Sequence, residues 1–214
     1  PFMVDRLRTA FSVDNIHHLP QCCDPEIHRA LPVSAADEAR YGADVTTYGN
    51  YYPYRARLLE PLLDSDLRLK LWGARPPRWL HHRVRRQWAG QSVIGDEKCV
   101  AMRAAKIALN TNHYAGISDV NKRTFELAAM GAFQLTDDRP ALSNYFVVGE
   151  EVATFRGRAD LLDRVCYYLA RPAERARIAA AGQTRAHRDH TFAARLRVIL
   201  QTLQPGSPAG PSPA

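Results

Sequence analysis

The sequence has little that would place it in a membrane or outside the cell. None of its apolar runs approaches the roughly 20 residues that a membrane-spanning helix requires. No segment at its start combines basic residues with an apolar stretch. The four cysteines include no Cys-x-x-Cys pair, and the adjacent Cys22 and Cys23 are poorly placed to bridge each other. We therefore expect free thiols and a cytoplasmic protein, with peripheral contact to a membrane left open.

Motifs of several common enzyme classes are also missing. The sequence contains neither the P-loop pattern nor Gly-x-Ser-x-Gly, and no pair of carboxylates indicates a hydrolase. The pairs His17-His18 and His81-His82 lack the i,i+4 spacing of metal ligands on a helix. The sequence therefore predicts no metal and no cofactor.

Basic residues outnumber acidic ones. The 29 Lys and Arg against 22 Asp and Glu give a formal net charge of +7. Such a balance favours anionic partners, which include nucleic acid, anionic lipid and phosphorylated small molecules. Because no basic run interleaved with aromatic residues and no known nucleic-acid motif stands out, a nucleic-acid partner is not expected.

Predicted strands alternate with predicted helices from residue 44 onward. Short β-branched or apolar runs predict strands at 44–49, 68–73, 92–95, 107–110, 133–136 and 151–155. Helical spacing and capping residues predict helices at 53–63, 79–88, 96–105 and 119–130, with two or three more between 159 and 203. This alternation is typical of an α/β fold with a Rossmann-like parallel sheet flanked by helices.

The two ends of the chain differ from its centre. Residues 1–36 are predicted to be irregular, with a short strand at 15–20, and we interpret them as a connector. Because the sequence opens on Pro1 rather than Met, we expect an upstream part to be missing. Residues 37–203 form the predicted domain, and the Pro- and Ser-rich residues 204–214 are predicted to be a disordered tail.

Candidate binding residues follow the predicted strands, because ligands of open α/β sheets bind at the carboxyl ends of the strands. Gly49 allows a close backbone turn, Asn50 follows it, and Arg55 lies in the first turn of the next helix. The helix N-terminus and the arginine together could hold a phosphate. The same pattern also fits an ordinary loop with a surface arginine, since one glycine turn is weak evidence.

A second polar group surrounds the strand at 107–110. Lys106 precedes this strand, and Asn110, Asn112 and His113 cluster at and just beyond its carboxyl end. These side chains could hydrogen-bond a ligand or could simply cap a loop.

A third group lies on the helix predicted at 119–130. Arg123 precedes Glu126 by three residues, so their side chains share one face of the helix. Arg123 suits a phosphate, and Glu126 can accept two hydrogen bonds from a pair of vicinal hydroxyls. The alternative is a surface ion pair worth a few tenths of a kcal/mol.

The residues around Glu126 resemble the CgeB-like branch of the group 1 glycosyltransferases. Residues 119–137 read Asp-Val-Asn-Lys-Arg-Thr-Phe-Glu-Leu-Ala-Ala-Met-Gly-Ala-Phe-Gln-Leu-Thr-Asp, and the resemblance continues through Gly149-Glu150-Glu151-Val152 and His190-Thr191-Phe192. Upstream it includes Gly49-Asn50, residues 106–110, and Cys23-Asp24-Pro25 with His28. It covers nearly everything from residue 19 to residue 203.

The resemblance implies a GT-B architecture, in which two Rossmann-like lobes face a cleft and the C-terminal lobe grips a nucleoside diphosphate sugar. Transfer is then metal-independent, with positive side chains stabilising the diphosphate as it leaves. By position, Glu126 is similar to the glutamate that contacts the donor ribose, and Asn121 and Arg123 match positions that line the donor site.

The resemblance also extends to the remaining candidates. Gly49 and Asn50 correspond to the first glycine-rich loop, Arg55 and Lys106 are candidates for the diphosphate, and the backbone of residues 93–95 resembles the segment that reads the base. Many members carry a second glutamate two helical turns before the first, where this chain has Ser118.

The predicted function is therefore the donor-binding half of a glycosyltransferase that uses a nucleoside diphosphate sugar. The acceptor, which could be a glycan, a protein or a small molecule, is unknown, and it is expected to bind an N-terminal lobe that also carries the catalytic base. Two alternatives stay open. One is a non-enzymatic Rossmann-like module that binds a nucleotide or a protein, and the other, on charge alone, is a nucleic-acid-binding domain.

Overall fold

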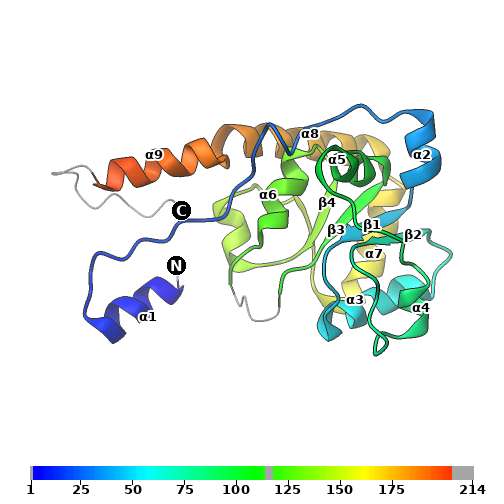
Figure 1. Cartoon of the computed structure of the whole chain (residues 1–214), viewed down its shortest axis with the longest axis horizontal. Helices are drawn as coiled ribbons and strands as arrows, with labels where there is room; N and C mark the ends of the chain where they lie inside the picture. Colours follow the sequence, from blue (N-terminus) through cyan, green and yellow to red (C-terminus); the bar gives the residue numbers. More distant parts are fainter. Residues whose placement is uncertain (1, 114–117, 204–214) are drawn as a thin grey trace.

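The computed structural model describes residues 2–113 and 118–203, and these form a parallel sheet covered by helices (Figure 1). The strands are β1 (Val45–Tyr48), β2 (Leu69–Trp72), β3 (Ile107–Asn110), β4 (Gln134–Asp137) and β5 (Ala153–Phe155). They are ordered β2-β1-β3-β4-β5, and each neighbouring pair is parallel. This arrangement confirms the predicted α/β class.

Helices precede, connect and follow these strands. Within the described residues they are α1 (Phe2–Phe11), α2 (Ala35–Tyr41), α3 (Pro53–Leu63), α4 (His82–Arg85), α5 (Gly95–Ala104), α6 (Lys122–Ala129), the 3-10 helix η1 (Pro140–Asn144), α7 (Gly157–Leu169), α8 (Pro172–Asp189) and α9 (Phe192–Leu203). None of these helices is both long and apolar enough to cross a bilayer.

The alternation of side chains along β3 separates two hydrophobic cores. Ile107 and Leu109 pack with the buried residues of α3 and α7, whereas Ala108 packs with those of α2, α5 and α6. Successive residues of a strand point to opposite faces, so helices cover both faces of the sheet. All four residues of β3 are buried, as expected for the central strand of a parallel sheet.

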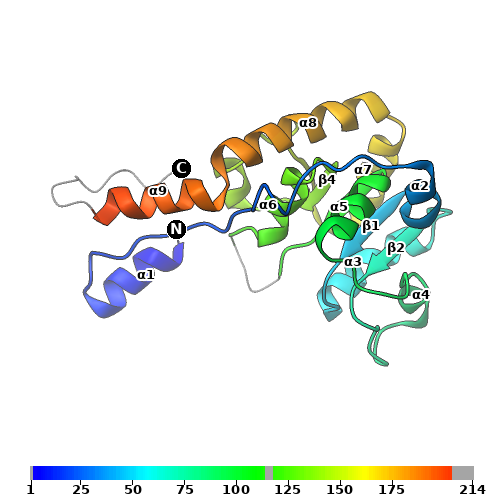
Figure 2. The same cartoon turned by 45° about the horizontal axis from the view of Figure 1, so that its top comes forward.

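The two ends of the chain meet beside the sheet. Helix α8 packs along α6, and from its end α9 leads away from the sheet, with α1 on the same side of the molecule (Figure 1 and Figure 2). Between α1 and α2 an extended segment, residues 20–33, runs back over the body, and we call it the strap. The Cys23 N–H of the strap donates to the His190 carbonyl at 2.8 Å, and the Phe192 N–H donates to the Cys23 carbonyl at 3.2 Å.

Two predicted element boundaries in the site region are wrong. Residues 92–94 form a loop rather than a strand, because Gly95 has a φ of +51° and begins α5. Asp96 lies in the first turn of that helix instead of capping it. Helix α6 begins at Lys122 rather than near Asp119, because the Asn121 side chain caps it by accepting from the Thr124 N–H.

The helix predicted at 79–88 is shortened by tertiary pairing. Only His82–Arg85 is helical, because the chain beyond it runs beside β2. There Leu71 accepts from the Ala89 N–H and donates to the Gln87 carbonyl, both at 2.9 Å. A β-type contact with the edge strand therefore ends the helix.

The amino-terminal region is more regular than predicted. Helix α1 lies within the supposed connector, and residues 15–20 are not assigned to a strand. The start of α2 has a local cause, since Ser34 and Asp37 form a reciprocal capping box. Three helices follow β5, the larger of the two predicted numbers. The predicted tail, residues 204–214, lies outside the described residues.

Candidate functional site

A cavity of about 610 Å³ opens at the carboxyl ends of β1 and β2. Gly49 and Gly73 end these strands with φ values of +106° and +145°. A Cβ on Gly73 would stand 2.8 Å from the Gly49 carbonyl oxygen, so only glycine lets the two loops approach this closely. The loop at 92–95 and the N-terminal parts of α5 and α6 supply the other walls.

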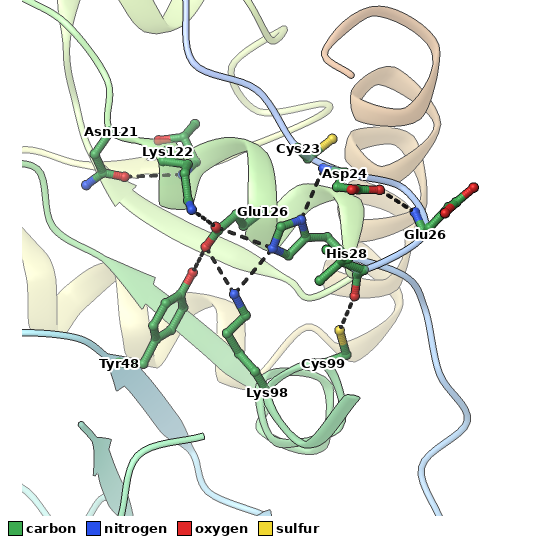
Figure 3. Close-up of polar contacts among 12 residues, drawn as sticks. Cys23, Asp24, Glu26, His28, Tyr48, Lys98, Cys99, Asn121, Lys122 and Glu126 are labelled. Carbon is green, nitrogen blue, oxygen red and sulfur yellow. Dashed lines mark hydrogen bonds and ion pairs between the residues drawn. The ribbon is translucent and has the colours of Figure 1, made fainter. Parts of the chain in front are cut away.

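Glu126 is the buried acid of this cavity. Its Oε2 accepts a hydrogen bond from the Tyr48 hydroxyl at 2.5 Å and lies 3.4 Å from Lys98 Nζ. Its Oε1 lies 2.9 Å from Lys122 Nζ and 3.3 Å from His28 Nε2 (Figure 3). The residue is only 3% exposed, and its four partners come from the strap, β1, α5 and α6.

These partners keep the Glu126 carboxylate ionised. Burial by itself would raise the pKa of Glu126. Hydrogen bonds from His28 and Tyr48 lower it, and so do the positive charge of Lys98 and a bond from Lys122. Together they hold the pKa well below its ordinary value of 4.5. Burial and the charge of Glu126 raise the pKa of Tyr48 well above 10. At neutral pH the pair is therefore a carboxylate that accepts from a neutral phenol.

Arg123 stands beside Glu126 but is not its ion-pair partner among the described residues. Its guanidinium lies over the Tyr48 ring, 4.9 Å from the centroid, and its Nη1 is 3.4 Å from Asn110 Oδ1. Its buried Nε has no hydrogen-bond partner within residues 2–113 and 118–203. Because Arg123 lines both the main cavity and a smaller one of about 310 Å³, its charge is placed where an anion could bind. The alternative of an Arg123–Glu126 surface pair does not hold.

Two asparagines build the N-terminus of α6. Asn121 Oδ1 accepts from the Thr124 N–H at 3.2 Å, and the side-chain amides of Asn110 and Asn121 exchange hydrogen bonds of 3.1 and 3.2 Å. Asn121 lines both cavities, as a ligand-binding residue requires. Asn110 is fully buried and also donates to Gln134, so it supports α6 from behind and does not line a cavity. Its predicted direct contact with a ligand stays a prediction that this placement does not support.

Arg55 holds the loop that follows β1. It donates to the Asn50 carbonyl at 2.7 Å, to Thr47 Oγ1 at 2.5 Å and to the Tyr48 carbonyl at 3.0 Å. Burial, followed by the charge of Arg123, lowers its pKa to about 9. Asn50 lines both cavities and Arg55 lines the smaller one. The sequence-predicted residues Gly49, Asn50, Arg55, Asn121, Arg123 and Glu126 are thus brought together.

Lys106 is not part of this group. It precedes β3 and therefore lies at the amino end of a parallel sheet whose carboxyl ends form the cavity. Its Nζ is 2.8 Å from Asp44 Oδ1, at the start of β1. This placement does not support the prediction that Lys106 helps to bind a diphosphate, because the length of β3 separates it from the cavity.

The smaller cavity collects the residues predicted beyond β3. Its lining includes Asn112 and His113 together with Tyr52 and Tyr54. The His113 ring meets the Tyr52 ring edge to face, with centroids 4.9 Å apart. The Asn112 amide donates to Asp137 Oδ1 at 2.8 Å, so it also fixes the end of β4.

Sequence reasoning singled out none of the four donors to Glu126. Lys122 stands inside the family-like string at 119–137, and the other three come from other elements. Tyr48 is the last residue of β1, Lys98 lies one turn inside α5, and His28 belongs to the strap. The signal for His28 was present, since it stands with Cys23-Asp24-Pro25 in the family resemblance. Nothing local marks Tyr48 or Lys98, because only the sheet order brings their elements against α6.

Metal ligands do not gather at this site. Across residues 2–113 and 118–203 there is no group of three or more His, Cys, Asp or Glu side chains that could hold a metal ion. The polar chemistry of the cavity is therefore that of one carboxylate surrounded by ammonium, guanidinium, amide and backbone N–H groups.

Comparison with known proteins gives a family for most of the chain. A family model described as glycosyl transferase-like matches residues 55–201. The spore protein CgeB of Bacillus subtilis (strain 168) is 25% identical over 182 residues, which cover 78% of this chain and 55% of CgeB. These matches confirm the resemblance on which the sequence prediction rests.

Solved structures show the same fold. Sucrose-phosphate synthase from Thermosynechococcus elongatus superimposes with a TM-score of 0.69 at 14% identity, covering 92% of this chain and 54% of the synthase. HepE from Anabaena, crystallised with UDP and glucose, gives 0.65 at 12% identity, covering 85% of this chain and 55% of HepE. The chain thus spans about half the length of the relatives that it matches.

Proposed function

Because the chain belongs to the glycosyl transferase-like family, we propose that it forms the donor-binding lobe of a glycosyltransferase, which transfers a sugar from a nucleoside diphosphate sugar to an acceptor. One observation carries this proposal. A buried, ionised carboxylate, Glu126, lies at a cavity on the carboxyl edge of the sheet, with Lys98, Lys122 and Arg123 around it. HepE, which shares the fold, was crystallised with UDP and glucose.

Different parts of the donor would contact different walls of the cavity. Glu126 accepts the vicinal hydroxyls of the ribose, because an ionised carboxylate has acceptor positions for two donors. The diphosphate lies toward Arg123 and the N-terminus of α6, where the guanidinium charge and the helix dipole favour negative charge. The base reaches the loop at 92–95, whose backbone lines the same cavity.

This arrangement has a catalytic use. As the bond between sugar and diphosphate breaks, negative charge develops on the leaving phosphate oxygen. Cationic side chains already fixed nearby stabilise that charge without reorganisation. In this proposal the acceptor and the catalytic base belong to a second lobe, so the described residues bind the donor and stabilise the leaving group.

Calorimetry with UDP, GDP and dTDP tests donor binding. We expect one of them to bind more tightly than 1 mM, which corresponds to about −4 kcal/mol. Glu126→Gln keeps the shape of the side chain but removes the charge, and it should weaken binding by about tenfold or more. Lys106→Ala, which changes a charge at the opposite end of the sheet, is the matched control and should bind like the wild type.

The outcomes separate the proposal from its rivals. If none of the three diphosphates binds more tightly than 1 mM, the donor-lobe proposal is wrong. Binding to random DNA with a steep dependence on salt would instead support a nucleic-acid function. Tight diphosphate binding that is unaffected by Glu126→Gln would keep a nucleotide-binding role but reject the assigned site.

A further inference from the structure

His28 reaches the site from outside the sheet. It belongs to the strap, which is tied to the junction of α8 and α9 through Cys23 and to α5 through the Cys99 thiol, 3.2 Å from the Ile27 carbonyl. The His28 side chain is 8% exposed, and its Nε2 faces Glu126 Oε1 at 3.3 Å (Figure 3). The described fold thus places an imidazole from a remote segment directly against the carboxylate.

The strap also decides which nitrogen of His28 carries the proton. The Asp24 N–H donates to His28 Nδ1 at 3.2 Å, so Nδ1 is the acceptor. In a neutral imidazole the other nitrogen is then the donor, and Nε2–H points at Glu126. Lys98 Nζ lies 3.3 Å from the same Nε2, but two donors cannot bond each other. Lys98 therefore donates to Glu126 Oε2 at 3.4 Å.

The four donors around Glu126 form a symmetric pattern. Oε1 receives one neutral donor, His28, and one ammonium, Lys122, while Oε2 receives the neutral Tyr48 and the ammonium of Lys98. A carboxylate has about four acceptor positions, so all of them are in use. A ribose can bind only if two of these donors leave.

Burial indicates which donors leave. The Lys122 side chain is 61% exposed and that of Lys98 is 14% exposed. Both lysines line the cavity, as Tyr48 does, but an ammonium group on a long flexible side chain can turn to water or to an incoming anion, whereas the Tyr48 hydroxyl is held on a rigid ring at the end of β1. His28 does not line the cavity, and its ring is held by the strap on one side and by Glu126 on the other. Moving a buried neutral donor would leave it without a partner, which costs more than turning a lysine.

We propose that His28 and Tyr48 are positioning residues that fix the Glu126 carboxylate, and that Lys98 and Lys122 give up their places on it to the two ribose hydroxyls. The inference rests on the proposed function, since it presumes a ribose at Glu126. One hydroxyl then bonds each carboxylate oxygen, and the released ammonium groups face the cavity that receives the diphosphate. His28 thereby takes part in donor recognition through Glu126, without lining the cavity itself.

The test compares UDP, or GDP if that is the diphosphate that binds, with its 2′,3′-dideoxy analogue, which lacks both hydroxyls. The ratio of their dissociation constants, measured by calorimetry, isolates the contact with the carboxylate. Binding of dTDP alone, which has no 2′-hydroxyl, would overturn the inference. His28→Gln places an amide N–H where Nε2–H stands, so it should keep the wild-type ratio. His28→Asn is too short to reach Glu126, and it should reduce the ratio by about tenfold, the equivalent of one hydrogen bond to a charged group. Lys122→Ala should leave the ratio unchanged or raise it.

A matched control separates positioning from a loosened strap. Arg29→Ala removes an exposed ion pair between the strap and Asp96, 2.9 Å long, without touching Glu126, and it should keep the wild-type ratio. If His28→Asn weakens both nucleotides equally, or if Arg29→Ala lowers the ratio as much, His28 is merely structural and the inference is overturned. A wild type that does not bind UDP, GDP or dTDP would instead overturn the proposed function.

The tautomer can be tested without a nucleotide. In ¹⁵N spectra of the histidine-labelled chain, the His28 signals are assigned by their loss in His28→Gln. We expect a protonated Nε2 and an unprotonated Nδ1 at neutral pH. A proton on Nδ1 would contradict the acceptor role that the Asp24 N–H requires, and it would overturn the inference even if UDP binds as proposed.

Discussion

His190 should make the protein lose stability between pH 7 and pH 5. Its ring lies at the junction of α8 and α9 and is nearly inaccessible. Nε2 donates to the Tyr145 carbonyl at 2.8 Å, and Nδ1 accepts from Arg195 Nη2 at 3.1 Å. Protonation would put a second N–H against this guanidinium. Burial lowers the pKa of His190 from 6.5 to about 4. The hydrogen bond to Tyr145 opposes this shift, and the charges of Arg195 and Arg185 add to it.

The direction and size of the effect follow from this pKa. Because the pKa of His190 is lower in the folded state, its contribution to the free energy of unfolding is fully present above the unfolded pKa of 6.5 and is lost as the pH falls toward 4. Between pH 7 and pH 5 the loss in the free energy of unfolding is about 2 kcal/mol. The depressed pKa of Glu126 acts only below its ordinary value of 4.5, so it hardly contributes in this window.

Urea unfolding followed by circular dichroism at both pH values measures the effect. His190→Gln keeps an N–H donor toward the Tyr145 carbonyl but cannot be protonated. The wild type should lose about 2 kcal/mol more than this variant between pH 7 and pH 5. His17→Gln, at an exposed histidine, should behave like the wild type. Equal losses in the wild type and His190→Gln would refute the reasoning, because the acid-sensitive group would then lie elsewhere.

Two further predictions concern glycine and charge at the ends of the sheet. Gly49→Ala should lower the free energy of unfolding by ~1–3 kcal/mol in urea titrations, because φ is +106° and the new Cβ would stand 2.8 Å from Arg123 Nη2. The same variant should weaken UDP binding by displacing that guanidinium, and wild-type affinity would count against the Arg123 placement. Lys106→Ala should lower the free energy of unfolding by no more than ~1 kcal/mol, because the Lys106 side chain that pairs with Asp44 is half exposed. It should bind UDP as the wild type does. Weakened binding would mean that the diphosphate contacts the amino end of the sheet, which would contradict the proposed site.

Local pattern was enough for the five strands of the sheet and for several loops, although it also predicted strands at 15–20 and 92–95 that do not form. The runs at 45–48, 69–72 and 107–110 are short, apolar or β-branched, and they form strands where predicted. Pro53 at the start of α3 and the positive φ of Gly131 after α6 follow from the intrinsic preferences of proline and glycine. These features depend on neighbours within a few residues, so a single sequence carries them.

Long-range pairing decided the features that were missed. The helix predicted at 79–88 ends early because residues 87–89 hydrogen-bond the edge of β2, which no local pattern announces. The strap looked irregular because its partners, His190 and Phe192, are more than 150 residues away. The contacts that hold it are with residues far away in the sequence, so its sequence shows no periodicity of its own.

The candidate site shows the same division. The sequence by itself determined that Arg123 and Glu126 share one face of a helix that follows a strand, because helical geometry places residues three apart side by side. Only the tertiary structure decided the partners of Glu126. The order of the strands sets Tyr48 and Lys98 beside α6, and the strap adds His28. Spacing alone would allow Glu126 to be half of a surface ion pair, but in the folded chain it is a buried carboxylate with four donors. Lys106 lies before β3 and pairs with Asp44 at the amino end of the sheet, a placement that the predicted parallel strands already implied.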